Sequence, residues 1–262
     1  MNRELAPRTG ARTFRSDSKN LTPTRLQPVR NCLCSRSLLA CVLILCFAPL
    51  ERSLAAPSGS AVFTYRRIFK SSTPEFIEIK IDENSDKASY EIRQLDEDPG
   101  ATLFEISPAL RQKIFALTAQ LNHFSGLDLD IHRKIANLGE KTFRWERGSE
   151  AHEVKFNYTV NSAASQLLQL CEGLARQQEL VEVLQRRIKY DRLGVNDALL
   201  QLETDLSKGV LPEPQQLLPQ LDQISGDYRF VEIARQRARA LAERVRHSSR
   251  ADLGGMSGTK SP

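Results

Sequence analysis

Two parts of this sequence alternate apolar and polar side chains with the period of a β-strand, and this pattern restricts the fold more than any other feature. The first part covers residues 62–95, and its clearest stretch holds isoleucines at alternate positions, Ile77, Ile79 and Ile81. The second part covers residues 141–158, where Gly148-Ser149 supplies a turn. Because successive side chains of a strand point to opposite faces, each part predicts strands with one buried face and one face in solvent.

Helical signals separate and follow these strands. Ser107-Pro108 predicts a helix start, because serine accepts hydrogen bonds from free N–H groups and proline suits the first helical position. Apolar residues then recur at helical spacing to about Asn122, and a longer helix is predicted over residues 161–192. The order β-β-β-α-β-β favours an α+β fold, in which helices pack on one face of an antiparallel sheet of about five strands.

The C-terminal extension is predicted to be all-helical. Over residues 194–247, Asn196-Asp197 is expected to cap a helix that ends near Gly209. Pro219 is expected to kink or break the next helical piece, because proline removes a backbone hydrogen bond.

The N-terminal residues have the order of a secretory signal peptide. Basic residues precede an apolar run from Leu38 to Leu50, and the small residues Ser53 and Ala55 follow it. As a helix, these 13 residues would reach about 20 Å, against roughly 30 Å of bilayer hydrocarbon. We therefore expect cleavage after Ala55 and export to the periplasm or the exterior. The alternative is a protein that stays membrane-anchored through residues 38–50, because charged residues lie between the apolar run and the cleavage site.

These patterns divide the chain into a signal peptide with its n-region (1–55), an α+β domain (61–193), a helical subdomain (194–247) and a disordered tail (248–262). The whole chain has a net charge of +5, but residues 56–262 hold 28 basic and 29 acidic residues. The excess positive charge belongs to the leader, so nucleic-acid binding is not expected of the exported protein.

One short segment carries side chains suited to metal binding. Polar and apolar residues alternate in Asp128-Leu129-Asp130-Ile131-His132. An extended strand would therefore project Asp128, Asp130 and His132 to one side, where two carboxylates and an imidazole could bind a divalent metal ion. The alternative is a solvated loop after the first helix, which we favour because no further ligand pair with metal spacing is present.

Other candidate groups favour structural roles. Cys171 is the only cysteine after residue 55, so residues 56–262 cannot form an internal disulfide, and Cys171 is expected to be buried among leucines. Residues 134–142 contain one glycine, which is too few for a phosphate-binding loop. We assign no catalytic residue and expect no cofactor.

Two segments allow both a functional and a structural interpretation. In residues 189–195, Tyr190 and Arg192 are either ligand contacts or part of the joint between the long helix and the C-terminal helices, and we favour the joint. Seven arginines lie between Asp227 and Arg250 and could bind anionic lipid or another polyanion. They spread around the helix, so we favour a solvated helix face.

Three parts of the chain resemble exported bacterial proteins that have no assigned activity. They are Ser107-Pro108 with Ile114-Phe115-Ala116-Leu117 and Leu121-Asn122-His123-Phe124, then Phe156-Asn157-Tyr158-Thr159, and finally Tyr190-Asp191-Arg192-Leu193-Gly194-Val195. The resemblance covers about residues 61–245 and brings no activity with it.

Together these features predict an exported, non-enzymatic envelope or secreted protein. It would bind another macromolecule, either an envelope protein or a polyanion, through its sheet face or its helical C-terminal part. Contact with a membrane would be transient and made by the leader only. The competing prediction is an envelope metal-dependent hydrolase that uses Asp128, Asp130 and His132.

Overall fold

The computed structural model describes the backbone of residues 59–255 and the side chains of residues 59–248. The predicted signal peptide lies outside these residues. No helix in the described part of the chain is both long and apolar enough to cross a membrane. The elements follow in this order: β1 (Ala61–Ile68), β2 (Phe76–Asp82), β3 (Lys87–Arg93), β4 (Thr102–Glu105), α1 (Pro108–Gln120), η1 (Asn122–Phe124), β5 (Glu140–Arg147), β6 (Glu150–Phe156), α2 (Ser162–Tyr190), α3 (Val195–Ser207), η2 (Pro214–Leu217), α4 (Leu218–Gly226) and α5 (Glu232–Gly255).

The strands form one antiparallel sheet in the order β4-β3-β2-β1-β5-β6. In the middle of the sheet, Tyr65 of β1 faces Ile79 of β2 on one side and Phe143 of β5 on the other. This confirms the α+β prediction, with six strands where about five were expected. The additional strand is β4, which has four residues and buries only Phe104 among them, so it shows no clear alternation.

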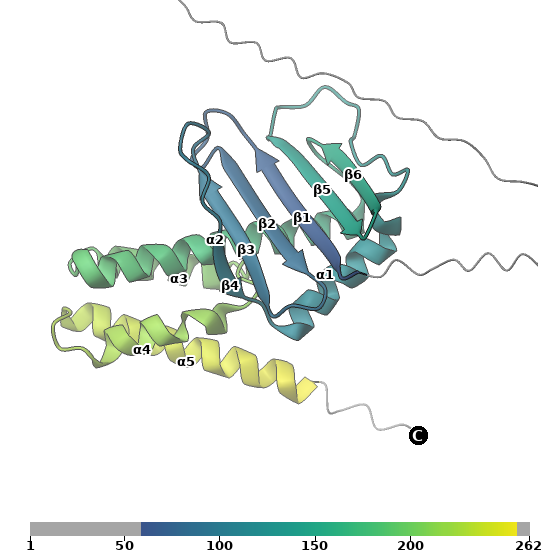
Figure 1. The fold of residues 1–262 in the computed structure, drawn as a ribbon. Helices are drawn as coiled ribbons and strands as arrows, with labels where there is room; N and C mark the ends of the chain where they lie inside the picture. The colour runs from purple at the N-terminus through teal and green to yellow at the C-terminus, as the bar shows by residue number, and fades with distance from the viewer. Residues whose placement is uncertain (1–58, 256–262) are drawn as a thin grey trace, which may run out of the picture. The chain divides into compact units, whose positions relative to one another are not determined.

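Helices α1 and α2 lie behind one face of the sheet, and no helix of residues 59–255 covers the other face (Figure 1). A hydrophobic core fills the covered side, where Phe63 and Phe143 of the sheet join Phe124, Leu167 and Leu174. Full burial of such a side chain contributes about 1.5–3 kcal/mol. The covered face therefore holds the sheet and helices together, and within residues 59–255 no helix packs on the outer face.

A second hydrophobic core holds the C-terminal helices together. It contains buried residues from Leu180 to Val245, which belong to the end of α2 and to the helices that follow. The first core ends on α2 at Ala175, so the two cores divide inside this helix. The predicted domain boundary at residues 193 and 194 falls instead in the connection between α2 and α3.

Two helices begin at the capping residues that the sequence indicates. The N–H of Leu110 donates to Oγ of Ser107 at the start of α1 (3.2 Å), and the N–H of Ala164 donates to Oδ1 of Asn161 at the start of α2 (3.1 Å). Each bond satisfies one of the N–H groups that a helix start leaves without an intrahelical partner.

Two helix ends differ from the expectation, whereas the break expected near Pro219 is present. The predicted cap at Asn196-Asp197 is wrong, because α3 already begins one residue before Asn196. Pro219 lies in the first turn of α4, where no intrahelical bond is lost, so the break falls between η2 and α4. Helix α5 extends to Gly255, past residue 248, where the predicted tail begins.

Candidate functional site

The uncovered face of the sheet carries polar and charged side chains from four neighbouring strands. Because β1 alternates between the two faces, Thr64 and Arg66 point away from the core. Thr64 is paired with Lys80 of β2 and with Arg144 of β5, and Arg144 is paired in turn with Glu153 of β6. A continuous polar row therefore crosses the middle of the sheet.

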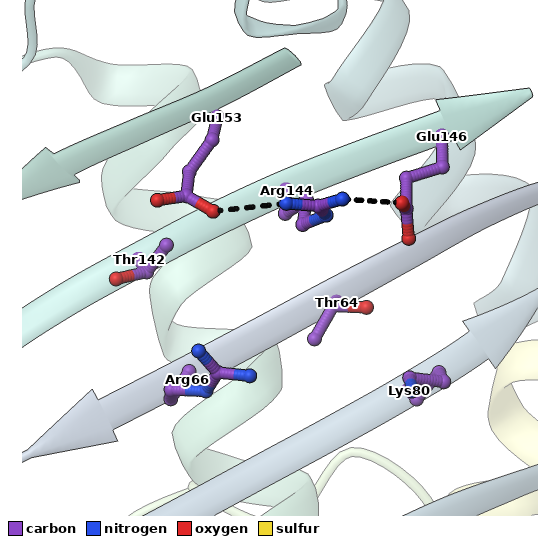
Figure 2. A pocket seen from close by; sticks show the side chains of 7 residues that line it. All are labelled: Thr64, Arg66, Lys80, Thr142, Arg144, Glu146 and Glu153. Atoms are coloured by element: carbon purple, nitrogen blue, oxygen red, sulfur yellow. Dashed lines mark hydrogen bonds and ion pairs between the residues drawn. The ribbon is translucent and has the colours of Figure 1, made fainter. Parts of the chain in front are cut away.

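A shallow depression of about 110 Å³ lies at the centre of this face (Figure 2). Thr64 and Thr142 are each 6% exposed and form its floor, because longer side chains rise around them. Their hydroxyl groups can both donate and accept hydrogen bonds. We term the depression and its lining the sheet-face site; the lining is Thr64, Arg66, Lys80, Thr142, Arg144, Glu146 and Glu153.

Ion pairs position the charged side chains of the sheet-face site. Nη2 of Arg144 lies 2.6 Å from Oε1 of Glu146, and Nη1 lies 3.4 Å from Oε2 of Glu153 (Figure 2). The hydrogen bond from Arg144, with a smaller effect of Lys80, holds the pKa of Glu146 below its ordinary value. Exposed ion pairs of this kind contribute about 0–1 kcal/mol to stability. Their main effect here is therefore to hold the charged side chains in fixed orientations.

Arg66 and Lys80 present positive charge to solvent most openly. Nη2 of Arg66 lies 2.6 Å from Oε2 of Glu78, yet the Arg66 side chain remains 45% exposed. Lys80 is exposed and forms no ion pair with any residue that the structure describes. With Arg144, these side chains place three cations around two threonine hydroxyls. Because both arginines already pair with glutamates, Lys80 is the cation best placed to bind a carboxylate of a partner.

Asp128 and His132, two of the three predicted metal ligands, are in contact. Residues 127–138 form no strand, so the extended segment expected here is absent and the residues lie in a loop, the alternative that we favoured. Nε2 of His132 lies 2.6 Å from Oδ2 of Asp128. Their hydrogen bond raises the pKa of His132 and lowers the pKa of Asp128.

The third predicted ligand, Asp130, is engaged elsewhere. Its Oδ1 accepts hydrogen bonds from the backbone N–H groups of Asn157 (3.0 Å) and Tyr158 (3.3 Å), which lower the pKa of the carboxyl. Among residues 59–248, no group of three or more His, Cys, Asp or Glu side chains is placed to hold a metal ion. The metal site at Asp128, Asp130 and His132 stays a prediction.

Sequence reasoning missed a partly buried polar cluster between the sheet and α2, formed by Tyr65, Arg67, Lys141 and Glu172. The Tyr65 hydroxyl donates to Glu172, and Nη1 of Arg67 donates to the same carboxylate (2.8 Å). Lys141 is 7% exposed and donates from Nζ to three backbone carbonyl oxygens. Arg67 and Lys141 occupy core-facing positions of alternating strands and are paired across β1 and β5. A charged residue in such a position is the signal that could have revealed the cluster.

Cys171 lies next to this cluster on α2 and is fully buried, as the sequence predicts. Burial raises the pKa of its thiol well above the ordinary value. The reactive thiolate is therefore disfavoured, and the residue acts as a small apolar side chain.

The interpretation of Tyr190 as part of a sealed helix joint is wrong. Tyr190 is 72% exposed and Leu193 is 79% exposed. The joint between α2 and α3 is made instead by buried Val195 and by Asp191, whose Oδ1 accepts from the N–H of Gly194 (3.0 Å).

Several arginines of α5 contact neighbouring helices. Nη2 of Arg246 lies 2.6 Å from Oδ1 of Asp222 on α4, and Nε of Arg237 lies 3.4 Å from Oε2 of Glu203 on α3. Arg237 also donates to Asn196. These side chains join the C-terminal helices to one another.

The chain was also compared with known proteins. No known protein-family model matches it. No curated protein sequence matches it significantly.

Proposed function

We propose that this protein is an exported, non-enzymatic binding protein that docks another protein of the cell envelope on the uncovered face of its sheet. The sheet-face site is the observation that carries the proposal. It offers cations, carboxylates and hydroxyl groups side by side on a surface that no described helix covers. A rigid sheet holds these groups at fixed spacing, which favours recognition of a preformed partner surface.

The mixed charge of this face supports a protein partner over a polyanion. Arg66, Lys80 and Arg144 are interspersed with Glu146 and Glu153, which would repel a uniformly negative polymer. A protein surface can place an acidic side chain against each cation and a basic one against each carboxylate. Such complementarity of charge gives specificity and a high association rate.

Photo-crosslinking in cells that export the protein tests this proposal. A photoreactive residue replaces Ser89, which neighbours Lys80 across β2 and β3 on the outer face. We expect one discrete adduct with an envelope protein, and we expect the double variant Arg66→Glu, Lys80→Glu to reduce it about tenfold, because both cations then repel the partner.

The matched control places the photoreactive residue at Gln112, an exposed position of α1 on the helical side. This position should give no adduct of the same mass. Equal adducts at both positions, or an adduct that the charge reversal leaves unchanged, would contradict docking on the sheet.

Export is proposed from the apolar run at residues 38–50, which lies outside the described residues. N-terminal sequencing of protein recovered from the envelope should begin immediately after Ala55. Recovery from the cytosol with the leader intact would overturn this assignment.

The alternative function, a metal-dependent hydrolase, rests on the contact between Asp128 and His132. Metal analysis of the purified protein decides between the two functions. A stoichiometric divalent metal that is lost in Asp128→Asn would favour the hydrolase, whereas purified protein without metal that also takes up no added zinc would exclude this site.

A further inference from the structure

Large apolar side chains are exposed at the connections between the C-terminal helices. We term four of them the helix-tip patch: Tyr190 (72% exposed), Leu193 (79%), Tyr228 (84%) and Val231 (43%). Tyr190 is the last residue of α2 and Leu193 lies in the connection to α3, whereas Tyr228 and Val231 lie in the connection between α4 and α5. Single exposed apolar residues are common, but four on two neighbouring connections form a patch that needs an explanation.

The two connections lie at the same end of the C-terminal helices (Figure 1). Arg237, in the second turn of α5, donates to Asn196, in the first turn of α3. The starts of α3 and α5 are therefore adjacent, and each start directly follows one of the connections. In addition, the pKa of Asp227 is lowered to about 2, mainly by Arg229 and to a smaller extent by the charge of Arg192. Arg192 of one connection therefore lies near Asp227 of the other.

Exposed cations lie beside the helix-tip patch, at the end of α2 and in its connection to α3. They are Arg186, Lys189 and Arg192, and none of them forms an ion pair with another residue of the described range 59–248. Nζ of Lys189 lies 4.9 Å from the centre of the Tyr190 ring. An aromatic ring with an adjacent cation combines an apolar surface with positive charge.

Two carboxylates of the connections are already paired, and Asp197, in the first turn of α3, is the exposed carboxylate that has no ion pair with another described residue. Asp191 forms an ion pair with Arg187, and Oδ2 of Asp227 lies 2.6 Å from Nη2 of Arg229. Arg186, Lys189 and Arg192 outnumber Asp197, so the charge left for an outside partner is positive.

We propose that the helix-tip patch docks on a bilayer surface that contains anionic lipids. The tyrosine rings suit the headgroup region, because they have an apolar body and a polar hydroxyl. Leu193 and Val231 reach toward the acyl boundary, and the three cations bind the lipid phosphates. This membrane contact is made by the C-terminal helices and leaves the sheet-face site free for its partner.

The charge of the patch argues against a second copy of the chain as its occupant. A twofold contact through the patch would bring Arg186, Lys189 and Arg192 close to the same residues of the other copy. Like charges in such an interface repel, whereas an anionic lipid surface attracts all three.

Tryptophan fluorescence of the full-length Tyr228→Trp variant tests the proposal. The native Trp145 is 3% exposed in the first core and provides a constant background. With vesicles of equal parts phosphatidylcholine and phosphatidylglycerol, we expect the introduced tryptophan to shift its emission to shorter wavelength and to be quenched by brominated lipids. Vesicles of phosphatidylcholine alone should produce neither change.

The matched control is Leu103→Trp, which places a tryptophan at a 67% exposed position of β4. Both variants carry the same leader, so any binding by the leader affects them equally. The proposal is overturned if the emission of the two introduced tryptophans changes alike when vesicles are added. It is also overturned if the protein cosediments with the vesicles while the emission of the tryptophan at position 228 stays unchanged. An emission shift that depends on protein concentration without lipid would point to self-association and would also overturn it.

Binding strength provides a second, independent measurement. Arg192→Gln should weaken partitioning to the anionic vesicles about fivefold, because one surface cation is removed. Leu193→Asp should weaken it more strongly, whereas Leu103→Asp should leave it unchanged. Equal affinities of Leu193→Asp and the unaltered protein would contradict insertion of the patch.

Discussion

Glu172 is the residue on which the polar groups between the sheet and α2 converge. Its carboxylate accepts hydrogen bonds from Tyr65 and Arg67 while its own side chain is 31% exposed. Tyr65 is completely buried, and a buried hydroxyl without a partner is unfavourable by about 1–3 kcal/mol. The pairing therefore allows a tyrosine and an arginine to occupy core-facing positions of β1.

Replacement of Tyr65 by phenylalanine should lower the free energy of unfolding by about 1 kcal/mol at neutral pH, because a hydrogen bond to a carboxylate is lost. Burial, followed by the charge of Glu172, raises the pKa of Tyr65 well above its ordinary value of about 10. The contribution of Tyr65 to the free energy of unfolding is thus complete below about pH 10. It is lost as the pH rises through the higher pKa that Tyr65 has in the folded state. Urea unfolding as a function of pH measures both effects.

The control for this residue is Tyr158→Phe, at a position that is 45% exposed. It should change neither the free energy of unfolding nor its alkaline pH dependence. If Tyr65→Phe and the unaltered protein lose stability in parallel above pH 10, the proposed role of the buried hydroxyl is wrong.

At the scale of elements, α2 packs tightly at Gly173 against the segment that follows α3. A Cβ atom on this glycine would lie 2.4 Å from the carbonyl oxygen of Val210 and 3.0 Å from ring atoms of Pro212. The segment after α3 can therefore pass directly against the middle of α2, where any side chain would hold the two apart.

Gly173→Ala should destabilise the protein by about 1–3 kcal/mol, because backbone atoms must move to admit the methyl group. This loss should exceed the gain of about 1 kcal/mol that alanine brings to a helix interior. Thermal or urea unfolding measures the difference.

Gly226→Ala is the control, since a Cβ on Gly226 at the end of α4 would meet no atom within 4 Å. The stability of this variant should be unchanged or slightly higher.

At the scale of the described molecule, one long helix serves two hydrophobic cores. Helix α2 has 29 residues, which corresponds to about 43 Å. Its first part packs in the core beneath the sheet, and its last part packs with α3, α4 and α5. Because neither core is complete without α2, we expect the two cores to unfold together.

Leu199→Ala tests this coupling, because Leu199 is completely buried in the second core. The change should lower the free energy of unfolding by about 2–5 kcal/mol. The unfolding transition can be followed by the fluorescence of Trp145, which lies in the first core, and by the far-UV circular dichroism of the helices. The midpoints of both transitions should shift to the same extent. An unchanged Trp145 transition would show that the cores unfold separately. Leu200→Ala, at the neighbouring 43% exposed position, should have little effect on either signal.

Most elements could be predicted from the sequence, because a strand or helix pattern is a property of neighbouring residues. The isoleucine alternation in β2 and the caps Ser107 and Asn161 are examples. At residues 128–132 the alternation would allow a strand, and the loop that we favoured is present instead. There the backbone N–H groups of Asn157 and Tyr158 bind Asp130, and the segment forms a loop.

The sequence by itself determined the order and type of most elements, the single cysteine after residue 55 and the near-neutral charge of residues 56–262. It also indicated that Thr64, Lys80 and Arg144 belong to strands. Only the tertiary structure decided that these three side chains are neighbours and that the connection between α2 and α3 lies at the same end of the helices as the connection between α4 and α5. The physical reason is that strand register and helix packing join residues far apart in the chain, and local periodicity carries no information about which distant segments meet.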